Sequence, residues 1–447
     1  MRGLGHLARL INHSDTMSKL SRRSFLAASA ALAAAPALGA VPASGDVDVV
    51  IVGAGAAGIA AARRVAAAGR RFALIEAADR IGGRCITDTR SFGVPFDRGA
   101  HWIHAPEINP VAKLAAQTGH EVYPAPRGQK LRIGQRNARE SELEAFLAAL
   151  FRSNRAIAEA ALGKTDMAAA RALPKDLGDW QPAVEFVLGP YTCAQELTAI
   201  SARDFARAAE RGSDAFCRQG YGALLAKLAE NIPVQLNTPA ISVEWLNRLE
   251  VETPKGKLRA RTVIVTVSTG VLATGKIKFV PELPKRQLDA IGKLKLGSYD
   301  HIALELPGNP LDLAHDDLVF EKSVTARTAA LLANIAGTNI CTVDVAGRFG
   351  RDLAAQGEPA MAAFAAEWLA DLFGANVKSA IKRTTVTRWN DEPWALGAFS
   401  AAAPGGETAR KALGEPIRDR LWLAGEAVHE TLWGTVGGAF ESGTRAA

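Results

Sequence analysis

The feature that most constrains this fold is a glycine-rich turn between a short apolar segment and a helical one. Residues 47–52 read Val-Asp-Val-Val-Ile-Val, which is typical of a buried parallel strand. The turn at 53–58 follows with Gly-x-Gly-x-x-Gly spacing, and residues 59–68 are helical in composition up to Gly69, which suits the left-handed position after a helix. The sequence therefore predicts a strand, a tight turn and a helix in succession.

A second predicted strand completes this unit. Residues 72–75 are apolar and end at Glu76, which lies 18 residues after Gly58 and can accept hydrogen bonds from ribose hydroxyls. Gly53 permits the tight turn, Gly55 lets the backbone approach a pyrophosphate, and Gly58 lets the helix pack on the strand. The free N–H groups at the start of the helix would face the phosphates. This context predicts a Rossmann-like, dinucleotide-binding domain in an α/β protein.

Four further segments carry a resemblance to a known family. They read Arg-Ile-Gly-Gly-Arg at 80–84, Phe-Asp-Arg-Gly-Ala-His-Trp at 96–102, Leu-Trp-Leu-Ala-Gly-Glu at 421–426 and Gly-Thr-Val-Gly-Gly-Ala at 434–439. Together with the turn they resemble the FAD-dependent amine oxidases, the monoamine and polyamine oxidase-like family. The resemblance covers nearly the whole chain after its first 44 residues. It implies FAD as the cofactor.

The resemblance also implies which residues hold the cofactor. Arg84 would offer a forked donor to phosphate, and Glu426 would meet the ribityl–phosphate region. Thr435 and Val436 would supply backbone N–H groups at a helix N-terminus pointing toward the flavin ring. The implied cofactor-binding residues are Gly53, Gly55, Ala56, Ala57, Gly58, Glu76, Ala77, Gly83, Arg84, Gly99, Ala100, His101, Trp102, Ala240, Trp389, Gly425, Glu426, Thr435 and Val436.

Ala398 bears on how the cofactor is attached. In animal monoamine oxidases the matching position is a cysteine that carries the flavin covalently. Alanine has no group that could form such a bond, so FAD is expected to be non-covalent and extractable on denaturation.

Three residues are implied to be catalytic by the same resemblance. Phe399 and Trp433 match the aromatic walls that flank the amine in front of the flavin and exclude water. His301 stands where the family has a lysine that holds a water near flavin N5. A histidine could orient a water there, or it could simply fill its strand position.

The expected activity is oxidation of a primary, secondary or polyamine to an imine and then an aldehyde or ketone. Dioxygen would return as hydrogen peroxide, or a periplasmic carrier would take the electrons. One alternative is an L-amino-acid oxidase on the same fold, which needs an arginine for the substrate carboxylate. Another is a flavin-binding protein or dehydrogenase with a non-oxygen acceptor, suggested by His301. Segments 262–306 and 421–445 are most similar to the polyamine oxidase and histone lysine demethylase branch, whose large coiled-coil insertion is absent from the sequence, so a chromatin role is not supported.

The expected organisation is a discontinuous FAD-binding domain and a substrate-binding domain of mixed sheet and helices. The first would comprise residues 45–125, 205–275 and 385–447, and the second residues 126–204 and 276–384. Apolar residues at helical spacing, such as Leu143, Phe146, Leu147, Leu150 and Phe151, indicate helices within 139–210. Residues 234–240 and 262–272 are expected to be strands that return to the FAD-binding domain.

The N-terminal residues read as an export signal. Arg22-Arg23 is followed by Ser-Phe-Leu and then an Ala-rich apolar run that is too short to span a bilayer, which resembles a twin-arginine signal. Residues 1–44 are expected to be the signal, and residues 1–16, before Met17, could be a start-site artefact that is not translated. The twin-arginine translocase would then export a folded flavoprotein to the periplasm or beyond, without a stable membrane anchor.

Charge and cysteine content exclude other classes. Residues 1–40 carry five basic side chains and one acidic side chain, so they hold +4 of the formal net charge of +7. The remainder is nearly balanced, and no nucleic-acid partner is expected. The four cysteines form no CxxC pair, and the histidines at 101 and 104 lack a third ligand nearby, so no metal site is expected.

Overall fold

The computed structural model describes residues 46–126, 128–208 and 213–447. The segment interpreted as an export signal, and the prediction that residues 1–16 are not translated, lie outside these residues. None of the helices in the described part of the chain combines the length and apolar character needed to span a bilayer.

The first of two large sheets is built around the strand that precedes the glycine turn. Strand β1 (Asp46–Val52) pairs in parallel with β2 on one side and with β13 on the other, and its Val50 and Ile51 are fully buried. The order is β10-β2-β1-β13-β12-β11-β14, and β22 also pairs with β13. The other strands are β2 (Phe72–Ile75), β10 (Val234–Gln235), β11 (Ser242–Glu244), β12 (Leu249–Thr253), β13 (Gly256–Val265), β14 (Lys278–Val280) and β22 (Leu421–Leu423).

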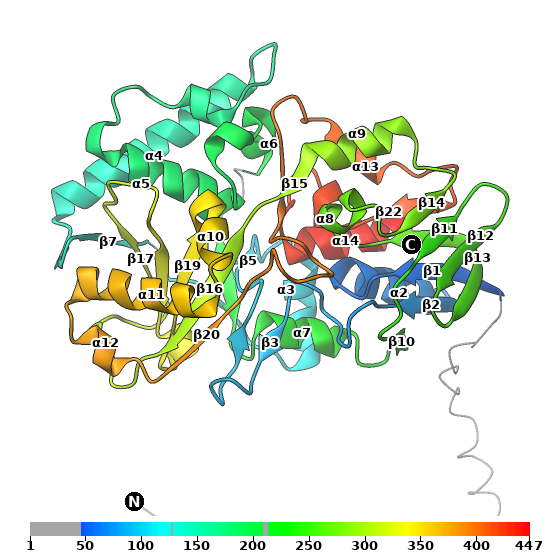
Figure 1. The fold of residues 1–447 in the computed structure, drawn as a ribbon, viewed down its shortest axis with the longest axis horizontal. Coiled ribbons are helices and arrows are strands. Elements are labelled where there is room, and N and C mark those ends of the chain that lie inside the picture. Colours follow the sequence, from blue (N-terminus) through cyan, green and yellow to red (C-terminus); the bar gives the residue numbers. More distant parts are fainter. Residues whose placement is uncertain (1–45, 127, 209–212) are drawn as a thin grey trace, which may run out of the picture. The chain divides into compact units, whose positions relative to one another are not determined.

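Two helices from opposite ends of the chain pack together beside this sheet. Helix α2 (Ala56–Ala67) follows the turn directly, and α14 (Val436–Ala446) contacts it (Figure 1). Their approach is close because Gly443 has no side chain: a Cβ there would lie 2.0 Å from the Ala57 carbonyl oxygen. Gly69 has φ +66°, so the predicted left-handed residue after the first helix is confirmed.

The second large sheet is mostly antiparallel. Its order is β20-β16-β19-β18-β17-β7-β8, with one parallel pair between β17 and β7. Helix α11 (Glu358–Phe373) buries Phe364, Trp368 and Leu369 in the core of this sheet. The strands are β7 (Lys130–Ile133), β8 (Arg136–Asn137), β16 (Tyr299–Glu305), β17 (Asp317–Glu321), β18 (Ala330–Ala333), β19 (Ile340–Ala346) and β20 (Arg383–Val386).

Helices predicted within 139–210 are present. Helix α4 (Glu140–Ala161) contacts α5 (Gln181–Phe186) and α6 (Ala202–Arg207), and a π-helical segment at 187–191 continues α5. Phe146 is fully buried, whereas Leu147 and Phe151 are 42% and 68% exposed. The remaining helices are α3 (Pro110–Ala115), α7 (Tyr221–Leu228), α8 (Thr269–Ala273), α9 (Lys285–Lys293), α10 (Gly347–Ala354), α12 (Val377–Ala380) and α13 (Ala409–Gly414).

Small sheets connect these parts. Strands β3 (Thr87–Asp88) and β4 (Phe96–Asp97) pair, β9 (Asp214–Cys217) lies between β5 (Ile103–His104) and β6 (Val122–Pro124), and β15 (Leu294–Leu296) pairs with β21 (Ser400–Ala402). The mixed helix-and-sheet fold with a Rossmann-like unit agrees with the sequence prediction. The five-segment division into domains stays a prediction.

Two strand predictions were too long. The strand predicted over 262–272 ends at Val265, and α8 begins at Thr269 because the Ser268 side chain caps it, accepting a hydrogen bond from Val271 N at 3.1 Å. Residues 234–240 form a strand only at 234–235, since Asn237 has φ +50°. Local capping and turn geometry override the apolar pattern in both places.

Candidate active site

The glycine turn has the geometry that a bound pyrophosphate needs. Gly53 has φ +101°, and a Cβ on Gly58 would lie 1.8 Å from the Gly53 carbonyl oxygen, so only glycine fits there. Gly55 is the N-cap residue of α2, and a Cβ added at Gly83 would lie 3.4 Å from the Gly55 Cα. Two glycine-containing segments therefore bring their backbones together at the helix N-terminus, where N–H groups are available to an anion.

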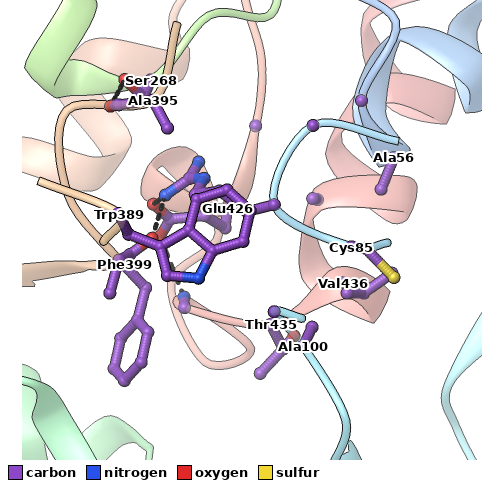
Figure 2. Close-up of a pocket in the computed structure, with 18 of the residues that line it drawn as sticks. Ala56, Cys85, Ala100, Ser268, Trp389, Ala395, Phe399, Glu426, Thr435 and Val436 are labelled. Atoms are coloured by element: carbon purple, nitrogen blue, oxygen red, sulfur yellow. Dashed lines mark hydrogen bonds and ion pairs between the residues drawn. The ribbon is translucent and has the colours of Figure 1, made fainter. Parts of the chain in front are cut away.

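A single cavity of about 710 Å³ extends from this turn. It takes its lining from both large sheets and from the helical region, and Figure 2 shows Ala56, Glu426, Thr435, Trp389 and Phe399 around it. The predicted site residues that line it are Gly53, Gly55, Ala56, Ala57, Glu76, Ala77, Gly83, Arg84, Gly99, Ala100, His101, Trp102, Ala240, His301, Trp389, Phe399, Gly425, Glu426, Trp433, Thr435 and Val436. Gly58 is not on the lining and acts through its close contact with Gly53.

Glu76 directly follows β2, at the position where the sequence pattern predicts an acidic residue that binds a ribose. Its side chain is buried, and its two carboxylate oxygens accept hydrogen bonds from Ala54 N at 2.6 Å and Ala78 N at 2.9 Å. These contacts fix the carboxylate on the cavity lining beside the turn. A carboxylate oxygen has a second lone pair, so a ribose hydroxyl can be bound in addition.

Arg84 and Glu426 form an ion pair on the same lining. Arg84 Nη1 lies 3.1 Å from Glu426 Oε1 and donates to the Ala398 carbonyl at 2.6 Å. Glu426 also accepts from Gly434 N at 3.0 Å and from the Ser400 hydroxyl at 2.7 Å. The arginine expected on a phosphate is thus also tied to the carboxylate expected beside the ribityl chain.

Aromatic side chains gather on another part of the lining. Phe399 precedes β21, and Trp433 precedes α14. Gly434, the residue after Trp433, packs so closely on Phe399 that an added Cβ would lie 3.0 Å from its ring. Trp389 donates from its indole nitrogen to the Arg98 carbonyl at 3.1 Å. Phe399, Trp433 and Trp389 thus line one cavity.

Two tyrosines that sequence reasoning missed complete this aromatic lining. Tyr299 has its ring centroid 6.1 Å from that of Phe399 and 6.0 Å from that of Tyr191. Burial and the nearby Asp344 carboxylate raise the pKa of Tyr299 well above its usual value, so the phenol stays neutral. Tyr299 lies two residues before His301 on one strand, and this period-two spacing was the signal that could have identified it.

His301 lines the cavity, but both of its ring nitrogens already have protein partners. Nδ1 donates to Asp344 Oδ1 at 2.7 Å, and Nε2 donates to the Gly99 carbonyl at 2.9 Å. Asp344 is the residue directly opposite on β19. Burial alone would lower the pKa of His301, but the charge and hydrogen bond of Asp344, with the Gly99 carbonyl, raise it to about 9. Both N–H groups of the imidazolium are therefore engaged by protein groups, and the role of His301 in orienting a water stays a prediction.

The other histidines near the cavity pair with carboxylates. His101 Nδ1 lies 2.9 Å from Asp97, and His104 Nδ1 lies 2.6 Å from Asp214. His429 does not line the cavity; its Nδ1 accepts from Leu432 N at 2.9 Å. Across residues 46–126, 128–208 and 213–447 no group of histidine, cysteine and acidic side chains is arranged to hold a metal.

Comparison with known proteins decides the family. A family model described as flavin containing amine oxidoreductase matches residues 56–447. The chain belongs to this family. A model of the twin-arginine translocation signal matches residues 19–39, so the protein is exported across the membrane.

Relatives differ in how much of their length the chain spans. It is 28% identical to human "Lysine-specific histone demethylase 2", covering 89% of this chain and 53% of that protein. It is also 28% identical to "Probable polyamine oxidase 4" of Arabidopsis thaliana, covering 89% and 86%. The chain thus spans about half the length of the human histone demethylase.

Solved structures show the same fold. Putrescine oxidase bound to putrescine superimposes with a TM-score of 0.76 at 20% identity, over 90% of this chain and 98% of that one. Cyclohexylamine oxidase from Brevibacterium oxydans IH-35A gives 0.75 at the same identity and coverage.

FAD is the cofactor of this family member, and the cavity fits it. The tight glycine contacts leave room for a pyrophosphate at the helix N-terminus, and two buried carboxylates lie on the lining for hydroxyl groups. Ala398 lies on the lining beside Phe399 and has no nucleophile. Non-covalent binding agrees with this side chain.

Proposed function

We propose that the protein is an exported, FAD-dependent amine oxidase that converts a primary, secondary or polyamine to an imine. The observation that carries the proposal is one continuous cavity that joins the glycine turn to an aromatic region containing Phe399 and Trp433. A cofactor held at the first part would present its reactive ring to an amine held at the second. Membership in the flavin containing amine oxidoreductase family supports this assignment.

Cofactor binding is assigned to the residues around the turn. The α2 N-terminus and Arg84 would hold the phosphates, Glu76 the ribose, and Glu426 the ribityl region. Thr435 caps the start of α14, so the free N–H groups of that helix would favour negative charge on the reduced ring. Bound FAD supplies the acceptor for the hydride equivalent that leaves the amine's α-carbon.

The protein's own contribution is orientation and exclusion of water. The faces of Phe399, Trp433 and Tyr299 would hold the carbon skeleton of the amine by dispersion. The amine must be neutral when it is oxidised, because its lone pair assists loss of the α-hydrogen. A dry aromatic wall favours the neutral form, since burial penalises charge.

The rival assignment, an L-amino-acid oxidase, requires an arginine that binds the substrate carboxylate. Among the described lining residues the arginines are Arg80 and Arg84. Arg80 donates to the Gly83 carbonyl at 2.9 Å, and Arg84 pairs with Glu426. Both lie with the cofactor residues, which favours an amine without an α-carboxylate.

Matched substrates separate these assignments. The purified protein would be assayed with 2-phenylethylamine against phenylalanine, and with putrescine against ornithine. Faster turnover of the amine in each pair supports the proposal, whereas preference for the α-carboxylate would indicate the amino-acid oxidase.

The electron acceptor is tested in the same assay. We propose dioxygen, with hydrogen peroxide released in proportion to amine consumed. Turnover that needs an added dye, with no peroxide in air, would instead identify a dehydrogenase that uses a periplasmic carrier. A flavin that no substrate reduces would support the non-catalytic alternative.

A further inference from the structure

Arg410 on α13 is a fully buried cation outside the cavity lining. It meets Asp204 on α6, also fully buried, in a two-pronged ion pair: Nε to Oδ1 at 2.7 Å and Nη2 to Oδ2 at 2.8 Å. Burying both charges carries a large desolvation cost, and well-packed apolar residues are often as stabilising. The pair therefore calls for an explanation beyond stability.

The guanidinium uses its whole fork. Nη1 donates to the Ser400 hydroxyl and to the Ala427 carbonyl, each at 3.0 Å, and Nη2 also donates to the Ser400 carbonyl at 3.2 Å. With the two bonds to Asp204, all five N–H groups of Arg410 are engaged. A lysine could not reproduce this planar set.

The face of the same guanidinium covers Trp433. Arg410 Cζ lies 4.6 Å from the centroid of the indole, and the indole nitrogen donates to the Asp204 carbonyl at 3.2 Å. Trp433 lines the cavity, while Arg410 and Asp204 do not. Arg410 thus contacts the face of Trp433 from outside the cavity by a cation–π interaction, and the backbone carbonyl of Asp204 holds the edge of the ring by a hydrogen bond.

The network continues to the cofactor residues. The Ser400 hydroxyl, which accepts from Arg410, donates to Glu426 at 2.7 Å, and Glu426 accepts from Gly434 N at 3.0 Å. Gly434 is the next residue after Trp433. Arg410 is therefore linked to Trp433 directly, through its ring, and to the neighbouring Gly434 through Ser400 and Glu426.

We propose that Arg410, held by Asp204, is a positioning residue for the amine site: it sets the orientation of Trp433 relative to Glu426. This rests on the proposed function, in which Trp433 flanks the amine. Arg410 does not line the cavity, so its effect on the reaction would pass through Trp433.

The test is a double-mutant cycle between Arg410→Lys and Trp433→Phe. The lysine retains the charge opposite Asp204 and loses the planar fork. We expect Arg410→Lys to slow anaerobic flavin reduction by an amine about tenfold per bound flavin. We expect Trp433→Phe to have a much smaller further effect in that background than in the wild type. If the double variant instead shows the product of the two single rate effects, the two residues act independently and the proposal is overturned.

A second readout does not depend on turnover. The difference in near-ultraviolet circular dichroism between the wild type and the Trp433→Phe variant reports how rigidly the indole is held. We expect a clear difference band with Arg410 present and its loss when the same comparison is made in the Arg410→Lys background. An unchanged band would show that the indole is fixed without the guanidinium.

Arg203→Lys is the matched control. Arg203 lies on α6 beside Asp204 and pairs with Glu407 at 3.1 Å, without lining the cavity. This variant should leave the flavin-reduction rate unchanged and combine multiplicatively with Trp433→Phe.

Asp204→Asn is a second variant, because it removes the charge that pairs with Arg410 while keeping a side chain of nearly the same size; the backbone carbonyl that Trp433 contacts is unaffected. Failure of both Arg410→Lys and Asp204→Asn to give a folded flavoprotein would count against the proposal, since the pair would then be needed for folding itself. A wild-type protein that no amine reduces would overturn the proposed function instead, and the dichroism result would still decide whether Arg410 holds Trp433.

Discussion

At the scale of single residues, the chemistry of this protein depends on side chains that are absent as well as on those present. Gly53, Gly58 and Gly83 shape the cofactor end because any Cβ there would meet backbone or require a left-handed conformation. The Gly-x-Gly-x-x-Gly spacing identified Gly53 and Gly58, and the family resemblance identified Gly83. It could not identify Arg410, Asp204 or Tyr191, whose importance arises from contacts between distant segments.

Gly58→Ala tests the turn. The added Cβ would lie 1.8 Å from the Gly53 carbonyl oxygen, so the helix must move away from the turn. We expect a loss of about 1–3 kcal/mol in stability and a weaker affinity for FAD, measured by thermal unfolding and by titration of the apoprotein.

Gly292→Ala is the control for that substitution. Gly292 lies in α9, and no atom is within 4 Å of its added Cβ. This change should be neutral or stabilise by up to about 1 kcal/mol. Equal behaviour of the two variants would contradict the steric explanation.

His301 gives a pH dependence of stability. The pKa of His301 is raised from 6.5 to about 9 in the folded protein. The protonated side chain therefore stabilises the fold fully below pH 6.5, and this contribution is lost as the pH rises through 9. Asp300, whose pKa burial raises to about 6, titrates below this window. We expect the free energy of unfolding to fall by on the order of 3 kcal/mol between these pH values.

His301→Gln should remove most of the fall in the free energy of unfolding between pH 6.5 and 9. Below pH 6.5 the pH dependence of the variant should resemble that of the wild type. Denaturant unfolding of both proteins across the window measures the difference. A wild-type slope that persists in His301→Gln would show that another group is responsible.

At the scale of elements, the first βαβ unit could be read from the sequence almost residue by residue. The apolar strand, the glycines and the left-handed Gly69 are local signals, and the structure has them as predicted. The error at 262–272 came from treating one apolar run as one strand, whereas Ser268 caps a new helix within it. The exposure of Leu147 and Phe151 shows the same limit, because spacing gives the helix but not which neighbour covers it.

Helix α14 supplies an element-scale prediction. Thr435 caps it: its hydroxyl oxygen accepts from Gly438 N at 2.9 Å and its hydroxyl donates to the Leu432 carbonyl at 2.7 Å. Thr435→Ala should cost about 1 kcal/mol of stability and weaken FAD binding, measured on the same preparations. Thr435→Ser keeps the cap and should resemble the wild type. If the serine variant is as impaired as the alanine variant, the threonine methyl and not the cap is what matters.

At the scale of the whole molecule, two sheets built from interleaved segments line one cavity. Strand β1 and helix α14 lie almost at opposite ends of the described chain, yet the turn after one and the start of the other meet on the same lining. Only the folded chain can therefore bind the cofactor, which suits an export route that carries folded proteins.

Replacing both Arg22 and Arg23 with lysine tests that route. We expect the flavoprotein to remain in the cytoplasm with its FAD, because the twin-arginine pair is the recognised signal. Replacing Arg2 and Arg9 with lysine, outside the matched residues 19–39, should leave export unchanged. Fractionation and flavin absorbance measure both, and continued export of the Arg22/Arg23 variant would contradict the assignment.

The central claim is that an amine held at the aromatic lining reduces the flavin held at the glycine turn. Anaerobic titration of the purified holoprotein with 2-phenylethylamine and with putrescine tests it most directly. The account predicts that at least one of these amines bleaches the visible flavin absorbance in proportion to the amine added. A flavin spectrum unchanged by either amine, and by a wider series of aryl, alkyl and polyamines, would contradict it.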